Sequence, residues 1–215
     1  MKKALFLTAV LLFAVGVFAD TTYNNYQGLS PFWQPFGNPN TATYGEVFTA
    51  PGAPDTNLAN FSFWFANPTV PGDILLGGYI ATWAGTNAGT LLYSSAAYDY
   101  PNTGEGKITF DTGGLTLTPG QQYVMFLSVS QYYGLSAGNA QVDAGTALPG
   151  QLNGFAWYNN ADNFNALFTN VWDNYGASPD WAVELNFNGV PEPGTLMLLG
   201  TGILGGLGVL RRKLF

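Results

Sequence analysis

Short segments in which apolar and polar residues alternate with a period of two run through residues 20 to about 189, and this pattern is typical of half-buried strands. In segment 61–65 (FSFWF) the three phenylalanines fall on one face. In segment 181–187 (WAVELNF) four apolar residues share one face and two polar residues take the other. Segment 124–129 (VMFLSV) is apolar on both faces, which predicts a central strand. Further strands are expected at 46–50, 78–83, 90–94, 106–111 and 154–158.

Glycine and proline separate these segments, with turn signals at 50–52, 70–73, 112–114 and 118–120. One short helix or turn is expected at 163–171. Eight or more short strands without long helices predict an all-β fold, namely a β-sandwich of jelly-roll type, with a barrel as the alternative.

Segment 117–123 (LTPGQQY) resembles a phrase that is common in secreted β-sandwich modules. In that phrase Pro-Gly makes a turn and the tyrosine begins a core strand, so Tyr123 is expected to begin one. This resemblance concerns the fold alone.

The first nineteen residues break the alternation and are typical of a removable secretory signal peptide. Lys2 and Lys3 precede the apolar run 4–17, and cleavage is expected between Ala19 and Asp20. A membrane anchor is the alternative, but fourteen apolar residues are short for a span that needs about 20. The expected partners at this end are the secretion machinery and signal peptidase.

A second apolar run occupies residues 195–210 and is followed at once by three basic residues. As a helix it would extend about 24 Å, slightly less than a hydrocarbon core of about 30 Å. We expect a transmembrane helix whose basic cluster stays in the cytoplasm as a membrane stop and leaves the acidic domain outside. The members of that cluster are Arg211, Arg212 and Lys213.

The triplet Pro191, Glu192 and Pro193 stands just before this run. Triplet, apolar run and basic cluster, at 190–213, together resemble the PEP-CTERM sorting tail of Gram-negative bacteria. The resemblance implies that the triplet is a sorting motif read by a transpeptidase-like membrane enzyme, an exosortase. It also implies an exopolysaccharide-producing, biofilm- or floc-forming bacterium, and the same tail is found on some proteins described as ice-binding.

Such a tail is an address and says little about the domain that it carries. An ordinary C-terminal anchor is the alternative, but it needs neither the triplet nor so short a helix. The expected organisation is a signal peptide (1–19), an extracellular domain (20–189) and a sorting tail (190–215). The expected location is the membrane, at least transiently, and then the cell surface or the extracellular matrix.

Charge narrows the choice of partners. Between residues 20 and 190 the single base Lys107 stands against twelve acids, a formal charge of −11. Such a surface repels nucleic acid and anionic lipid but is compatible with sugars, divalent cations or plain solubility. The chain has neither cysteine nor histidine. This excludes disulfides and Ser-His or Cys-His nucleophiles, and it disfavours zinc and most transition metals.

Six tryptophans and twelve tyrosines suggest sugar binding, because aromatic faces stack on pyranose rings. Neighbouring amide and carboxylate groups would bind the sugar hydroxyls. Core packing is the alternative, especially for Trp64, Trp83 and Trp181 in expected strands. The candidate sugar-binding residues are Trp33, Trp157, Tyr158, Trp172 and Tyr175.

The sequence supports catalytic and metal sites less well than it supports a sugar-binding site. Segment 111–113 (DTG) looks like the aspartic-protease signature, but that chemistry needs two carboxylates and the chain has no second copy. A strand leading into a Gly-Gly turn is the simpler interpretation. Asp99, Glu105, Asp173 and Asp180 lie in expected loops, yet no spacing singles out a glycosidase pair. No cofactor is expected other than calcium, for which Asp99 and Glu105 are the candidate ligands.

We therefore expect a non-enzymatic, surface-sorted matrix or adhesion protein. One alternative is a carbohydrate-binding module or lectin, for which Trp157 and Trp172 should be exposed together in a groove. The other is an extracellular polysaccharide hydrolase, for which two acids should face each other in a cleft.

Overall fold

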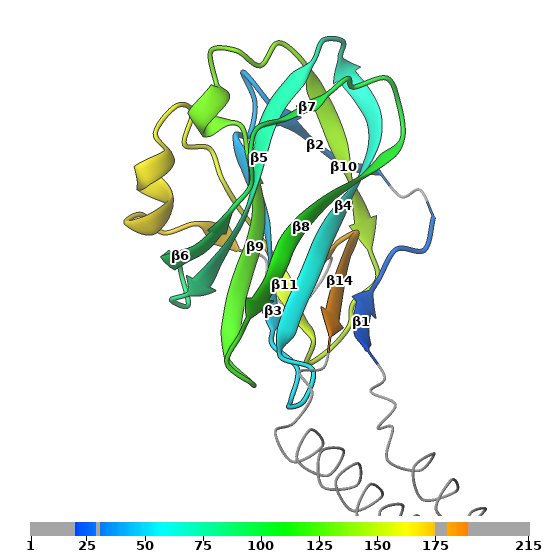
Figure 1. Ribbon diagram of the computed structural model, residues 1–215. Coiled ribbons are helices and arrows are strands. Elements are labelled where there is room, and N and C mark those ends of the chain that lie inside the picture. Colours follow the sequence, from blue (N-terminus) through cyan, green and yellow to red (C-terminus); the bar gives the residue numbers. More distant parts are fainter. Residues whose placement is uncertain (1–19, 29–30, 175–179, 189–215) are drawn as a thin grey trace, which may run out of the picture.

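The computed structural model describes residues 20–28, 31–174 and 180–188, and within them the chain forms two antiparallel sheets (Figure 1). The expected signal peptide with Ala19, the sorting tail and Tyr175 lie outside these residues. An all-β fold is therefore confirmed, while the jelly-roll connectivity stays a prediction.

Sheet 1 has the order β1-β14-β4-β10-β13, with β8 on the other side of β4 and β2 also paired to β10. Its strands are β1 (Thr21–Asn24), β2 (Pro31–Gly37), β4 (Asn57–Val70), β8 (Gly106–Thr116), β10 (Asn139–Gly145), β13 (Asp180–Trp181) and β14 (Val183–Asn188).

Sheet 2 has the order β12-β11-β3-β9-β5-β6, and β7 also pairs with β5. Two short 3-10 helices, η1 (Ser130–Tyr132) and η2 (Phe164–Phe168), complete the described residues, and η2 confirms the short helix expected at 163–171. The strands of sheet 2 are β3 (Thr43–Thr49), β5 (Ile74–Trp83), β6 (Ala88–Ser94), β7 (Tyr98–Tyr100), β9 (Gln122–Ser128), β11 (Leu152–Tyr158) and β12 (Asp173–Asn174).

The main hydrophobic core lies between the two sheets and is built from the inward-facing residues of both. The alternation in the sequence is confirmed: Phe61, Phe63 and Phe65 of β4 are all fully buried there. Val183, Leu185 and Phe187 of β14 are buried beside them, as is Trp181 of β13. Each such side chain contributes roughly 1.5–3 kcal/mol by leaving water.

Strand β9 is central, as its doubly apolar pattern predicts, because it pairs with β3 on one side and β5 on the other. Its outer face is buried in a second hydrophobic cluster beneath the η2 segment (159–172). That cluster contains Val47, Tyr79, Ala81, Ala88, Val124, Phe126, Ala156, Leu167 and Trp172. A strand can be apolar at nearly every position only when both of its faces are covered, because otherwise apolar side chains would be exposed to water.

The turn at 118–120 is confirmed, since the amide of Gln121 donates to the carbonyl of Thr118 at 3.2 Å. Tyr123 enters β9 directly after it and is buried, as expected from the phrase at 117–123. The Tyr123 hydroxyl accepts a hydrogen bond from the amide of Thr118 at 2.9 Å, which fastens the turn to the strand that it starts.

The prediction of a turn at 112–114 is wrong, because β8 continues to Thr116. Asp111 pairs with Asn60 and Leu115 pairs with Leu58, so four steps along β8 face two steps along β4. Gly113 and Gly114 have φ values of 67° and 90°. Both glycines therefore build a bulge, which uses the same positive φ as a turn but lets the strand resume.

The two ends of the described domain lie at the same end of the molecule. Strand β1 is antiparallel to β14, and Thr21 stands opposite Phe187 (Figure 1). The first and last strands of the described domain therefore begin and end side by side.

Candidate functional site

Trp172 belongs to the second hydrophobic cluster and is only 2% exposed. Its indole nitrogen donates to the carbonyl of Leu167 at 2.8 Å, and its ring meets Trp83 and Phe126 edge-on. Trp172 therefore offers no ring face to a sugar. The expectation that Trp157 and Trp172 are exposed together in one groove is not met.

The other aromatic candidates are scattered. Trp157 is half-buried on β11 and stacks on Phe155 with ring centroids 5.4 Å apart. The half-buried Tyr158 accepts a hydrogen bond from the Asn170 side chain at 2.6 Å, which ties it to the η2 segment. Trp33 lies in β2, but its ring, like the whole of Tyr175, lies outside what the structure describes.

Asp99 and Glu105 are both exposed and flank a loop that is held by an asparagine. Asn102 is buried with φ 51°, and its amide nitrogen donates to the carbonyls of Val70, Gly72 and Asn139 at 2.9–3.2 Å. These contacts give the loop a structural role. Among the described residues no group of three or more acids is placed to hold a metal ion, and calcium binding stays a prediction.

Buried carboxyls are a feature that the sequence reasoning missed. Glu46 faces the core from β3 and is fully buried, and its Oε2 accepts a hydrogen bond from the amide of Trp181 at 2.9 Å. Burial raises the pKa of Glu46 well above its usual value, and the charge of Asp180 raises it further. Burial likewise raises the pKa values of Asp143 and Asp180 to about 6. The sequence pattern could have revealed Glu46, because it lies two positions before the apolar Phe48 and therefore on the same, inward face of its strand.

The outer face of sheet 1 carries a polar array that the sequence reasoning did not single out. Four neighbouring strands, in the order β1, β14, β4 and β8, present there the residues that alternate with the core positions. The strand registers align them in rows. The first row is Thr22, Asn186, Asn60 and Asp111, and the second is Asn24, Glu184, Ser62 and Thr109. We call these eight residues the polar face.

Hydrogen bonds between side chains connect the polar face across the strands. In the first row the Thr22 hydroxyl donates to Asn186 Oδ1 at 2.8 Å, and Asn186 Nδ2 donates to Asn60 Oδ1 at 2.8 Å. In the second row Asn24 Nδ2 donates to Glu184 Oε2 at 2.7 Å, and the hydroxyls of Ser62 and Thr109 are 2.9 Å apart. The side chains are thereby held in defined orientations.

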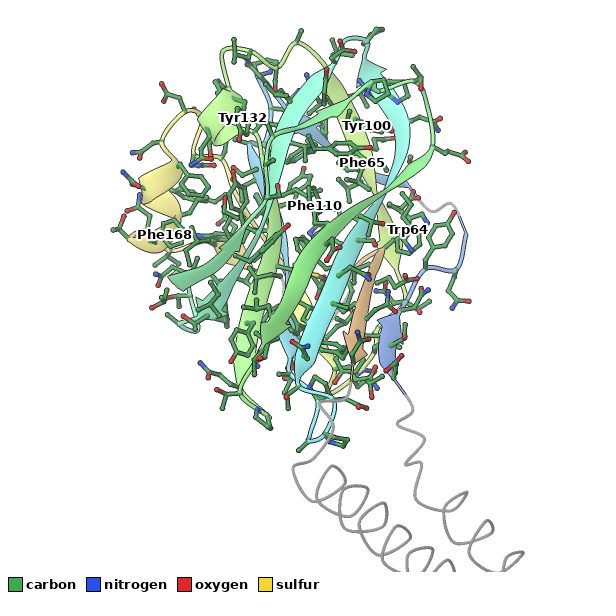
Figure 2. All side chains as sticks on the ribbon, viewed as in Figure 1. Trp64, Phe65, Tyr100, Phe110, Tyr132 and Phe168 are labelled. Carbon is green, nitrogen blue, oxygen red and sulfur yellow. The ribbon has the colours of Figure 1, made fainter. Side chains whose placement is uncertain are left out.

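An aromatic pair borders the polar face. Tyr26 stacks on Trp64 with ring centroids 4.6 Å apart and planes within 9° of parallel. Figure 2 shows Trp64 on the outside of β4, whereas Phe65 and Phe110 lie between the sheets. The core placement considered for Trp64 is therefore wrong, since the phenylalanines on either side of it occupy the inner face and direct its ring outward.

Lys107 joins the aromatic pair to the polar face. Its ammonium group lies 4.8 Å from the centroid of the Trp64 ring and 2.7 Å from Glu184 Oε1. Partial burial alone would raise the pKa of Glu184, but hydrogen bonds from Lys107, Asn186 and Asn24 and the lysine charge lower it below its usual value. Glu184 is therefore ionised at neutral pH and neutralises the only base of the domain.

The described part of the chain contains no helix with the length and apolar character needed to cross a membrane, and the helix expected at 195–210 lies outside it. A family model for the PEP-CTERM protein-sorting motif matches residues 189–213, one residue after β14 ends. The chain thus carries this sorting motif, which implies export, membrane-associated sorting by an exosortase-type enzyme and surface localisation.

Two solved structures align with most of this chain. One contains the cysteine protease and lectin-like domains of Cwp84, a surface layer associated protein of Clostridium difficile, with 11% identity, a TM-score of 0.47, and coverage of 80% of this chain and 36% of that one. The other is the clostridial cysteine protease Cwp84 after propeptide cleavage, with 14% identity, a TM-score of 0.48, and coverage of 80% and 40%. This chain thus spans less than half the length of either. No curated protein matches the chain.

Proposed function

We propose that the chain is a non-enzymatic protein of the bacterial surface, whose two-sheet domain contributes adhesion or structure to the extracellular matrix of an exopolysaccharide-producing Gram-negative bacterium. The observation that carries this proposal is the sorting motif that begins directly after β14. Because β1 lies beside β14, both attachments leave from one end. The opposite end of the sandwich then faces away from the membrane.

The placement of the acids supports a non-enzymatic role. A hydrolase of polysaccharides needs two carboxyls that touch the substrate. The acid pair in electrostatic contact, Glu46 and Asp180, is buried in the interior, where a polymer has no access. The exposed Asp99 and Glu105 flank a loop that Asn102 holds in place.

Surface display can be tested with variants of the sorting motif. In a Gram-negative host that has an exosortase, the full chain should become accessible to protease added to intact cells. Replacing both Pro191 and Pro193 by alanine should reduce the accessible fraction at least tenfold and leave the chain in the membrane fraction. Pro101→Ala, which changes an exposed proline of the domain, is the matched control. Equal accessibility of the motif variant would overturn the proposal.

Carbohydrate binding is a second candidate function, and the polar face of sheet 1 favours it. This face offers amides, hydroxyls and an aromatic pair, which are the groups that proteins use to recognise sugars. Loop aromatics, the basis of the prediction from sequence, do not support it in the same way because Trp172 is buried.

A further inference from the structure

We infer that the polar face of sheet 1, together with the Tyr26–Trp64 pair, binds a strand of neutral polysaccharide. This inference rests on the proposed surface role, because display outside the cell is what would bring the domain into contact with such polymers. It assigns the binding to the flat side of one sheet, away from the loops.

The two outer faces of the sandwich differ in what covers them. On sheet 2 the η2 segment buries Val124, Phe126 and Trp172 in a second core. On sheet 1 the outward residues of the polar face are polar, with Trp64 at their border, and most of them are partly or fully exposed, as are Thr22, Asn24 and Thr109. Sheet 1 thus has a face that needs no cover to fold and is open to a partner.

The side chains of the polar face are suited to hydrogen bonding with the hydroxyl groups of a polysaccharide. Three side-chain amides and the hydroxyls of Thr22 and Thr109 provide both donors and acceptors, and a sugar hydroxyl needs both. The third hydroxyl, that of Ser62, is buried and supports Thr109. The hydrogen bonds along each row restrict their rotamers before any ligand arrives. Less side-chain entropy is therefore lost on binding. Four strands spaced about 4.8 Å apart give a face about 14 Å wide, which is several sugar rings across.

The aromatic pair supplies an apolar contact at one border of the polar face. Tyr26 is partly exposed, so sugar C–H groups can pack against the face of its ring that points away from Trp64. Trp64 is covered by Tyr26 and Lys107 and holds the tyrosine ring in place. Lys107 lies over the indole and is held by Glu184, which fixes the border relative to the two rows.

Charge selects a neutral polymer over an anionic one. The single base of the domain is already neutralised by Glu184, and Asp111 adds a negative charge at the edge of the first row. The rest of residues 20–190 is acidic, with a formal charge of −11 in all. An anionic polysaccharide or nucleic acid would therefore be repelled, whereas a neutral glycan meets no such barrier.

Affinity electrophoresis tests this assignment on the full chain in mild non-ionic detergent. The probes are dextran, laminarin, hydroxyethyl cellulose and galactomannan as neutral polymers, with alginate as the anionic comparison. We expect at least one neutral polymer to retard the chain and alginate to leave its mobility unchanged. Trp64→Ala should weaken the retardation about tenfold, which corresponds to about 1.4 kcal/mol.

Two further variants keep the test decisive. Thr109→Arg places a long charged side chain on the second row. Because Thr109 is exposed the variant should still unfold cooperatively, with a midpoint lowered only by the loss of the hydrogen bond to Ser62, while binding is lost. Tyr98→Ala removes an aromatic ring that is 38% exposed on sheet 2 and should leave binding unchanged. Retardation by alginate alone, by no polymer, or equally in all variants would overturn the inference. The protease-accessibility experiment tests surface display independently of binding, so a failure of the binding inference can be told apart from a failure of the proposed function.

Discussion

Buried carboxyls are the most unusual residues of this domain, because residues 20–190 carry twelve acids and a single base that could neutralise them. Glu46 and Asp180 lie near each other, and Asp143 is also buried. Burial penalises the ionised form, so all three pKa values are raised. A group whose pKa is higher in the folded than in the unfolded state binds more protons when folded, and it therefore stabilises the fold at low pH.

We predict that the domain is more stable in mild acid than at neutral pH. Below about pH 4 the Asp180 carboxyl is protonated in both states and its contribution is fully present. As the pH rises through about 6 that contribution is lost, since the folded carboxyl must then ionise in the interior. The lowered pKa of Glu184 acts in the opposite direction, but only below its usual 4.5, outside this window. Urea unfolding at pH 4.5 and 7.5 should give the higher midpoint at pH 4.5.

Asp180→Asn checks the origin of this effect. An amide cannot ionise, so the variant should gain about 1–3 kcal/mol at pH 7.5 and show a weaker dependence on pH. Asp162→Asn, which changes an exposed acid, is the control and should behave like the wild type. A wild-type midpoint that rises between pH 4.5 and 7.5 would contradict the assignment.

Elements were predicted well wherever a local pattern determines them. The period-two alternation located β4 and β14, and the doubly apolar run located the central strand β9. The pair Gly113-Gly114 was misread because positive φ serves a turn and a bulge equally, and only the pairing of β8 with β4 decides between them. The exposure of a given tryptophan is likewise a tertiary property.

The same reasoning explains why the candidate site was missed. Thr22, Asn60 and Asn186 are far apart in the sequence, and only the registers of β1, β14 and β4 align them in one row. Conversely, the residues around Trp172 have no strand or helix pattern and therefore suggested an exposed loop. Only the packing of the η2 segment on sheet 2 buries this tryptophan.

Trp172→Ala tests the role of the η2 segment as the cover of sheet 2. The change removes a buried ring that contacts Trp83 and Phe126, and it should cost about 3–5 kcal/mol in the free energy of unfolding. Val171→Ala, at a neighbouring side chain that is 67% exposed, should cost less than about 0.5 kcal/mol. Chemical denaturation compares the two variants, and similar small losses in both would show that the segment is not part of the core.

At the scale of the whole molecule, one end of the sandwich is an attachment point and the polar face runs along its side. Strands β1 and β14 contribute to both features: β14 leads directly into the sorting motif, and the two strands carry half of the polar face. A tethered domain of this shape would present the polar face along its flank, where a polymer strand can lie against it.

Labelling of intact cells with a membrane-impermeant amine reagent tests the central claim, surface display of a processed domain, most directly. Residues 20–190 contain a single lysine, Lys107, and after signal cleavage their only other amine is the new N-terminus at Asp20, which is exposed. The one further amine of the cleaved chain is Lys213 in the tail. We predict that mass spectrometry finds the label on the α-amine of Asp20 and on Lys107 before the cells are lysed. Labelling of these two amines only after lysis, or an N-terminus that still begins at Met1, would contradict the account.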